Sequence, residues 1–184
     1  MAHGIIVESK IAAKDIDALN RSVVATADVD AGSLLALTAP STVGEDRWTV
    51  AQPSASALTD LWIAYNPTAR ITKIDDLEFA GLSVDDRRYT NIANKTFDAF
   101  KPKVGDEIEF SVDCVDPSAV ASVVAGDYLE SVAGSFKLAR IPAATGATAG
   151  HTAFKVEYVK TYQFPQKAIG DADVKFFRVV CVAE

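Results

Sequence analysis

The chain has 184 residues, of which 49% are hydrophobic and 23% charged, a composition typical of a folded protein with one substantial core. Its 25 acidic residues outnumber its 18 basic ones and give a formal net charge of -7, with no basic cluster to face phosphates, which argues against a nucleic-acid partner. No apolar stretch approaches the roughly 20 residues that cross a bilayer, and the first ten residues lack a secretory signal pattern, so we expect no membrane partner and synthesis in a cytoplasm.

Residues 1–20 are predicted to form an extended N-terminal arm, followed by a single β domain over residues 21–184. Gly4 to Val7 can pair as a short strand. The remaining apolar residues of the arm are too few for an independent helix: Ile11, Ile16 and Leu19. Such a segment must bury its apolar side chains elsewhere, either on its own domain or over a neighbouring subunit. Both alternatives stay open.

Three similar phrases place a glycine beside a small polar residue and before residues that suit a strand. They are centred on Gly32, Gly105 and Gly126. Because glycine takes a positive φ that other residues avoid, each phrase predicts a tight turn that leads into a β-strand. The repeated phrase is too short to indicate duplicated domains.

Apolar or alternating runs, separated by turn residues, predict the strands. The runs are residues 23–27, 34–37, 47–50, 58–65, 107–115, 128–132, 136–141, 154–162 and 174–182. The first two have the form of a hairpin or of a strand–turn–strand corner, and 58–65 fits a helical stripe as well as a strand, although Asn66-Pro67 favours a strand. The clearest alternation, in 107–115, directs Ile108, Phe110, Val112 and Cys114 to the core. A single helical turn is expected at 118–123.

About eight to ten short strands, with a turn every ten residues or so and no long amphipathic helix, predict an all-β fold. We expect a compact β-sandwich or β-barrel, with the N-terminal arm and a long irregular loop over residues 66–103. In that loop, well-spaced aromatic residues are expected to pin the chain to a surface.

The residues that commonly carry chemistry form no recognisable site. Cys114 and Cys181 lie within strand-like runs and are interpreted as buried reduced thiols, with a bridge between them open if their strands are neighbours. His3 and His151 have no metal-ligand spacing, and the acidic pairs follow no calcium-loop pattern. No phosphate loop, dinucleotide fingerprint or nucleophile motif is present. We therefore expect no enzyme activity, no cofactor and no metal.

The most distinctive sequence motifs lie between residues 60 and 110. It runs through Tyr65-Asn66-Pro67, then Asp85-Asp86-Arg87-Arg88-Tyr89-Thr90-Asn91, then Thr96-Phe97-Asp98-Ala99-Phe100-Lys101-Pro102-Lys103-Val104-Gly105-Asp106. This stretch resembles a family of tailed-bacteriophage head or capsid decoration (cement) proteins, found with the major capsid protein. The resemblance implies a non-enzymatic virion component on the outer face of the capsid, with the major capsid protein as partner. It brings no catalytic residues.

On this hypothesis the protein stabilises the capsid lattice and is itself a homo-oligomer, a dimer or a trimer. The arm and the long loop are the segments predicted to touch the partner. The candidate partner-binding residues are Ile5, Ile6, Val7, Ile11, Ile16, Leu19, Arg87, Arg88, Tyr89, Phe97 and Phe100.

Two other functions stay open. The aromatic residues permit a carbohydrate-binding module on a virion or cell surface, since sugar faces stack on exposed rings, although a core role is favoured for most of them. They are Trp48, Trp62, Tyr65, Tyr158 and Tyr162. The third possibility is a minor head-completion or tail protein, which differs in location and copy number.

Overall fold

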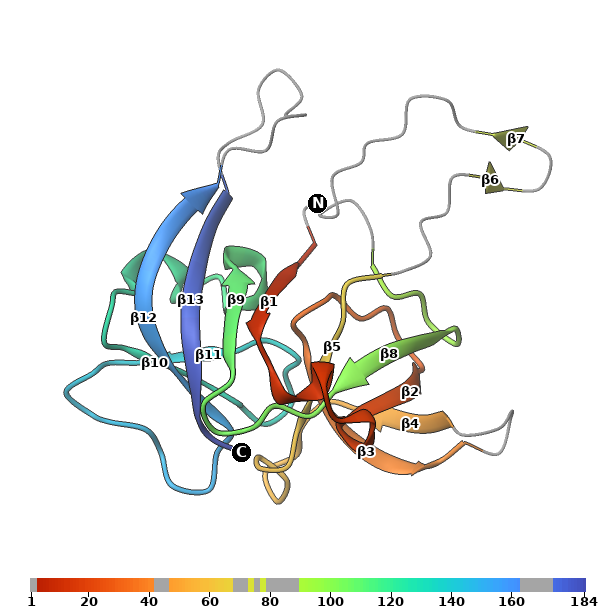
Figure 1. The fold of residues 1–184 in the computed structure, drawn as a ribbon, viewed down its shortest axis with the longest axis horizontal. Helices are drawn as coiled ribbons and strands as arrows, with labels where there is room; N and C mark the ends of the chain where they lie inside the picture. Colours follow the sequence, from red (N-terminus) through yellow and green to blue (C-terminus); the bar gives the residue numbers. More distant parts are fainter. Residues whose placement is uncertain (1–2, 42–46, 68–72, 75–76, 79–89, 163–173) are drawn as a thin grey trace.

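The chain folds into an open six-stranded β-sheet beside a small closed β-barrel, as a computed structural model shows (Figure 1). The structure describes residues 3–41, 47–67, 73–74, 77–78, 90–162 and 174–184. Eleven strands make up the sheet and the barrel, and β6 (Lys73–Ile74) pairs with β7 (Leu77–Glu78) in a separate two-stranded piece. The predicted all-β class is confirmed. No helix in the described ranges has the length and apolar character needed to span a bilayer.

The barrel has the strand order β2-β4-β3-β5-β8 and closes on itself. Its strands are β2 (Asn20–Ala25), β3 (Leu34–Pro40), β4 (Arg47–Ala51), β5 (Trp62–Ala64) and β8 (Thr96–Phe100). Strand β4 lies between β2 and β3 and runs parallel to β2, while the other pairs are antiparallel. Of the two predicted arrangements for β2 and β3, the structure therefore has the corner and not the hairpin.

The six-stranded sheet is antiparallel throughout, with the order β1-β9-β13-β12-β10-β11. Its strands are β1 (Ile6–Lys10), β9 (Glu107–Ser111), β10 (Tyr128–Glu130), β11 (Ala139–Ile141), β12 (Ala153–Tyr162) and β13 (Val174–Ala183). Short 3-10 turns flank these strands: η1 (Ala12–Lys14), η2 (Asp17–Leu19), η4 (Val112–Cys114) and η5 (Val120–Ser122). The last of these is the predicted helical turn.

One buried cluster joins the sheet to the barrel, and a second fills the barrel. Successive residues of a strand point to opposite faces, so Leu34 of β3 contributes to the shared cluster and Leu35 to the barrel interior. On β5, Ile63 belongs to the shared cluster and Trp62 to the barrel. Both faces of these strands are therefore buried, which explains why 61–64 is a continuous apolar run instead of an alternating one.

The predicted arm is an integral part of the sheet. Ile6 to Lys10 pair with β9, and the side chains of Ile5, Ile6 and Ile11 are 4%, 2% and 5% exposed. In Figure 1, β1 lies on the side of the sheet that faces the barrel. Of the two alternatives for residues 1–20, the structure has the one in which the segment packs on its own domain.

The three predicted glycine turns all have a positive φ. Gly32, Gly105 and Gly126 have φ values of +78°, +96° and +94°. Gly32 also has a packing requirement, since a Cβ there would lie 2.6 Å from Cys114 Sγ and 2.9 Å from Ile6 Cγ2. The turn before β3 is therefore packed against the first strand of the sheet.

Two predicted segments differ from the structure. Strand β9 ends at Ser111 and the chain turns at η4, so Val112 is half-buried while Ile108, Phe110 and Cys114 reach the core as expected. Residues 68–72, 75–76 and 79–89 of the predicted 66–103 loop lie outside the described residues, but 96–100 form β8, with Phe97 and Phe100 in the core. That portion is regular because its alternate residues fill the barrel.

The two cysteines are buried free thiols, as interpreted from the sequence. Burial raises the pKa of both thiols to about 12. They are therefore protonated core residues and not nucleophiles.

Candidate functional site

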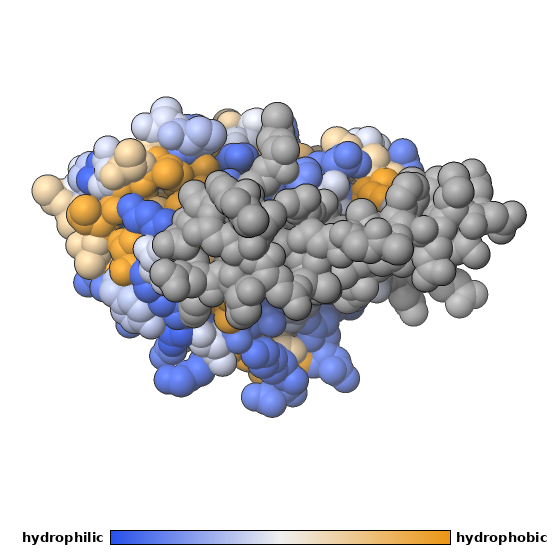
Figure 2. Space-filling view, turned by 90° about the horizontal axis from the view of Figure 1, so that it is seen from above, coloured by the Kyte–Doolittle hydropathy of each residue, from blue (hydrophilic) through white to orange (hydrophobic). Residues whose placement is uncertain are grey.

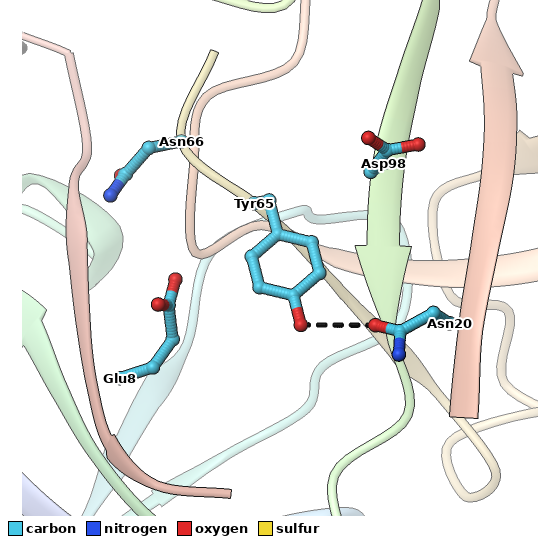
Figure 3. Close-up of a pocket in the computed structure, with 5 residues that line it drawn as sticks. All are labelled: Glu8, Asn20, Tyr65, Asn66 and Asp98. Carbon is cyan, nitrogen blue, oxygen red and sulfur yellow. Dashed lines mark hydrogen bonds between the residues drawn. The ribbon is translucent and has the colours of Figure 1, made fainter. Parts of the chain in front are cut away.

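A polar cleft opens where the sheet meets the barrel. It has a volume of about 540 Å³, within the range of small-ligand sites, and is lined by Glu8, Asn20, Tyr65, Asn66 and Asp98. Figure 3 shows Tyr65 in the middle, with Glu8 of β1 on one side and Asn20 and Asp98, from β2 and β8, on the other. The cleft thus exists only because the first strand of the sheet lies beside the barrel.

The carboxamides in the cleft hold the fold together. Asn66 accepts a hydrogen bond from the Ile6 backbone N–H at 3.0 Å and donates to the Ile6 carbonyl at 2.8 Å, so its side chain pairs with the free edge of β1. Asn20 donates to the carbonyl of Ala13 at 2.6 Å and accepts from the Tyr65 hydroxyl at 3.0 Å. These contacts commit one N–H of each carboxamide and the hydroxyl proton of Tyr65 to the protein itself.

The carboxylates make fewer contacts. Asp98 is exposed and accepts a hydrogen bond from the Ser22 hydroxyl at 3.1 Å. Among the described residues, no group donates a hydrogen bond to the carboxylate of Glu8, and Lys14 donates instead to its backbone carbonyl at 2.9 Å. Burial raises the pKa of Glu8, and the attraction of Lys14 only partly offsets it.

The pKa of Tyr65 is raised by burial and by the negative charges near the cleft. Burial raises the pKa of Tyr65 to about 12, and the charges of Glu8, Asp98 and Asp106 add to the increase. One side of the Tyr65 ring packs against Phe100, with ring centroids 4.7 Å apart. The cleft therefore combines an aromatic surface with carboxylate oxygens that still have acceptor capacity.

A second candidate surface is the face of the six-stranded sheet that points away from the shared core. Val7 on β1, Glu109 on β9, Arg178 on β13 and Tyr158 on β12 are directly paired and form one row across four strands. The outer members of this row are exposed, Val7 at 42% and Tyr158 at 44%. We call this row, together with the charged side chains around it, the outer face.

An ionic network holds the middle of the outer face. The side chains of Glu109 and Arg178 are 3% and 14% exposed, and Arg178 Nη1 lies 3.3 Å from Glu109 Oε1. Arg178 also contacts Glu107 and Ser9, and Lys160 contacts Glu109. Buried ions keep their charge when opposite charges surround them, and this network surrounds Glu109 with two cations. It also limits the freedom of the exposed side chains on either side.

Apolar side chains are exposed on the six-stranded sheet and its connections. Figure 2 shows apolar side chains gathered at the left, the end that the six-stranded sheet forms. The exposed large apolar residues of the described ranges include several from this sheet and its connections: Val7, Val124, Val132, Tyr158 and Val182. Exposed apolar and aromatic side chains next to a polar network are features of protein-binding surfaces.

The predicted partner-binding residues differ in their exposure to solvent. The side chains of Ile5, Ile6, Ile11, Phe97 and Phe100 are buried in this chain, so they are not available to contact a partner. Val7 and Ile16 are exposed, and Leu19 is half-buried. The candidates Arg87, Arg88 and Tyr89 lie outside the described residues.

The aromatic residues proposed for sugar stacking are also separated. Trp62 is buried in the barrel, Trp48 packs against it, and Tyr158 is on the outer face. Tyr65 lines the cleft. The side chain of Tyr162 lies outside the described part of the chain. These rings therefore do not form a common stacking platform.

Several residues of both surfaces were not predicted. Glu8, Asn20 and Asp98 have no local motif, because a strand pairing far along the chain brings them together. Arg178 did leave a signal, since a charged residue in the centre of the apolar run 174–182 requires a partner of opposite charge. In the described ranges, no group of three or more His, Cys, Asp and Glu side chains is placed to hold a metal ion.

No protein-family model, curated protein or solved structure matches this chain.

Proposed function

We propose that the chain is a non-enzymatic virion protein that binds the outer face of a tailed-bacteriophage capsid and stabilises it. The resemblance of residues 60–110 to capsid decoration proteins supplies the class of partner, the major capsid protein. In the structure this stretch contributes β5 and β8 to the barrel and most of β9 to the six-stranded sheet. Residues 85–89 of its middle phrase lie outside the described part of the chain.

The observation that carries the proposal is the outer face. Val7 and Tyr158 are exposed on either side of the buried Glu109–Arg178 pair. Exposed tyrosine presents a large, stiff contact area and loses little conformational entropy on binding. A sheet face with exposed side chains of this kind suits docking on another protein surface better than enclosing a small molecule.

Stabilisation follows from binding alone. A protein that binds the assembled lattice but not its separate subunits shifts the equilibrium toward the lattice by mass action. If the protein is a dimer or a trimer, several copies of the outer face contact the lattice together, and the overall affinity rises without new kinds of contact. No catalytic step is needed.

The test is co-sedimentation with expanded capsids of the phage that encodes this chain. Tyr158→Ala is expected to weaken binding about tenfold, the size of effect that a central aromatic contact produces. The matched control is Ile92→Ala, a substitution of another exposed apolar side chain, 38% exposed and outside the sheet strands, which should bind like the wild type. Circular dichroism verifies that both variants are folded.

Two outcomes would overturn the proposal. Failure of the wild-type protein to sediment with capsids removes the capsid as partner. Equal binding by the wild type, Tyr158→Ala and Val7→Asp removes the outer face as the contact surface.

A further inference from the structure

We propose that the cleft around Tyr65, which the carboxylates of Glu8 and Asp98 line, binds a positively charged group, an ammonium or a guanidinium. This inference goes beyond the proposed function and does not depend on it, because the outer face and the cleft use different residues. The cationic group can belong to a free polyamine or to a lysine or arginine side chain of another protein. The chemistry recognised in the cleft is the same in both cases.

The first argument is hydrogen-bonding capacity. The carboxamides of Asn20 and Asn66 donate to backbone carbonyls, and the Tyr65 hydroxyl donates to Asn20. Glu8 and Asp98 retain acceptor capacity, since a carboxylate offers about four lone-pair sites. A guest that donates hydrogen bonds, as ammonium and guanidinium groups do, would use this acceptor capacity.

The second argument is charge. Lys14 donates a hydrogen bond to the backbone carbonyl of Glu8. The carboxylate of Glu8 receives no hydrogen bond from the described residues. The raised pKa of Tyr65 reflects the nearby carboxylates as well as burial. A bound cation would offset this negative potential, whereas a neutral guest would leave it in place.

The third argument is shape. The Tyr65 ring forms a wall of the cleft and is supported from one side by Phe100. A cation over an aromatic face gains about 0.5–2 kcal/mol, more as water is excluded. The volume of about 540 Å³ accommodates an arginine or lysine side chain with part of its backbone. The aromatic face and the carboxylates are each features that attract a cation.

The test is isothermal titration calorimetry of the full chain with four probes. Spermidine represents the free polyamine, and the peptide Ac-Ala-Arg-Ala-NH₂ represents a protein side chain. Ac-Ala-Gln-Ala-NH₂ and methyl glucoside are the neutral controls. We expect saturable binding of at least one cationic probe and none of the neutral ones. Preference for spermidine or for the arginine peptide identifies the source of the cation.

Isosteric variants locate the binding. Glu8→Gln and Asp98→Asn keep the shape of the cleft and remove one charge each. Each should lower the affinity for the cationic probe at least tenfold. The matched control is Asp15→Asn, which removes an exposed charge that does not line the cleft and should leave the affinity unchanged. Thermal unfolding of each variant verifies the fold.

Three results would overturn the proposal: no saturable binding of either cationic probe, equal binding of a neutral probe, or affinities that Glu8→Gln and Asp98→Asn leave unchanged. Absence of cation binding would not affect the co-sedimentation of the protein with capsids, which depends on Tyr158. Failure of one proposal can therefore be distinguished from failure of the other.

Discussion

Glu109 on β9 and Arg178 on β13 form an ion pair in the middle of the outer face, with Arg178 Nη1 3.3 Å from Glu109 Oε1 and only 3% of the Glu109 side chain exposed. The strand register places them directly opposite each other. A charge so deeply buried is tolerated because Lys160 contacts the same carboxylate. The pair therefore links β9 and β13 in the middle of the outer face.

Removing one partner of this pair should be strongly destabilising. Glu109→Ala removes the carboxylate that Arg178 and Lys160 share and leaves Arg178 with Glu107, so we expect a loss of about 1.5–3 kcal/mol in the free energy of unfolding. The matched control is Glu157→Ala, because Glu157 lies 3.7 Å from Arg178 Nε with a side chain that is 45% exposed. That substitution should change stability by less than about 1 kcal/mol. Urea denaturation measures both, and equal effects would contradict the assignment.

The position of residues 1–20 gives a second prediction. Ile6→Ala removes a side chain that is 2% exposed in the core, and it should destabilise the fold by about 2–5 kcal/mol. Its neighbour Val7 points to the outer face and is 42% exposed, so Val7→Ala should change stability by no more than about 0.5 kcal/mol. Thermal unfolding separates the two. A small effect of both substitutions would mean that the segment is an arm that does not belong to the core.

Gly32 and Gly105 form a natural pair of test sites for the glycine turns. Both have a positive φ, but a Cβ at Gly32 would collide with Cys114 and Ile6, whereas one at Gly105 meets nothing within 4 Å. Gly105→Ala should therefore cost only the conformational penalty of about 1–2 kcal/mol. Gly32→Ala adds overpacking of about 1–3 kcal/mol to that penalty. Chemical denaturation that ranks Gly105→Ala as the more harmful change would refute this packing argument.

Asp127 makes part of the stability depend on pH. Burial opposes its ionisation, but Arg140 Nε at 2.6 Å and the backbone N–H groups of Val124 and Ala143 outweigh this and lower its pKa. A carboxyl with a lowered folded-state pKa contributes stability above its unfolded pKa of about 3.9, and this contribution is lost as pH falls through the folded value.

Asp127→Asn is expected to destabilise the protein at pH 7 by about 1.5–3 kcal/mol, the range for hydrogen bonds to charged groups. It should also reduce the slope of stability against pH below about pH 4. Denaturant midpoints measured between pH 3 and pH 7 give both quantities. Asp116→Asn is a suitable control for the network around Arg140, since Asp116 also has a lowered pKa but is held by Ser118. An unchanged acid slope in Asp127→Asn would exclude Asp127 as its source.

Short-range patterns in the sequence predicted most of the local elements. Gly32, Gly105 and Gly126 marked turns because only the backbone conformation of a few residues is involved. The alternation of Ile108 and Phe110 identified the core face of β9, and the buried state of Cys114 and Cys181 followed from their apolar neighbours. The all-β class followed from the same short-range patterns. Each of these features depends on residues within a few positions of one another.

The way in which these elements combine depends on long-range strand pairing. The apolar run 61–64 fills two cores because the barrel closes on one side of β5 and the sheet packs on the other, a consequence of pairings far along the chain. Ile5, Ile6, Phe97 and Phe100 resembled contact residues in isolation, yet long-range strand pairing buries them. The same pairing brings Glu8 beside Tyr65 and Asp98, and Glu109 beside Arg178. A local pattern specifies that a strand has a face to bury, but the burying surface is supplied by strands distant in sequence.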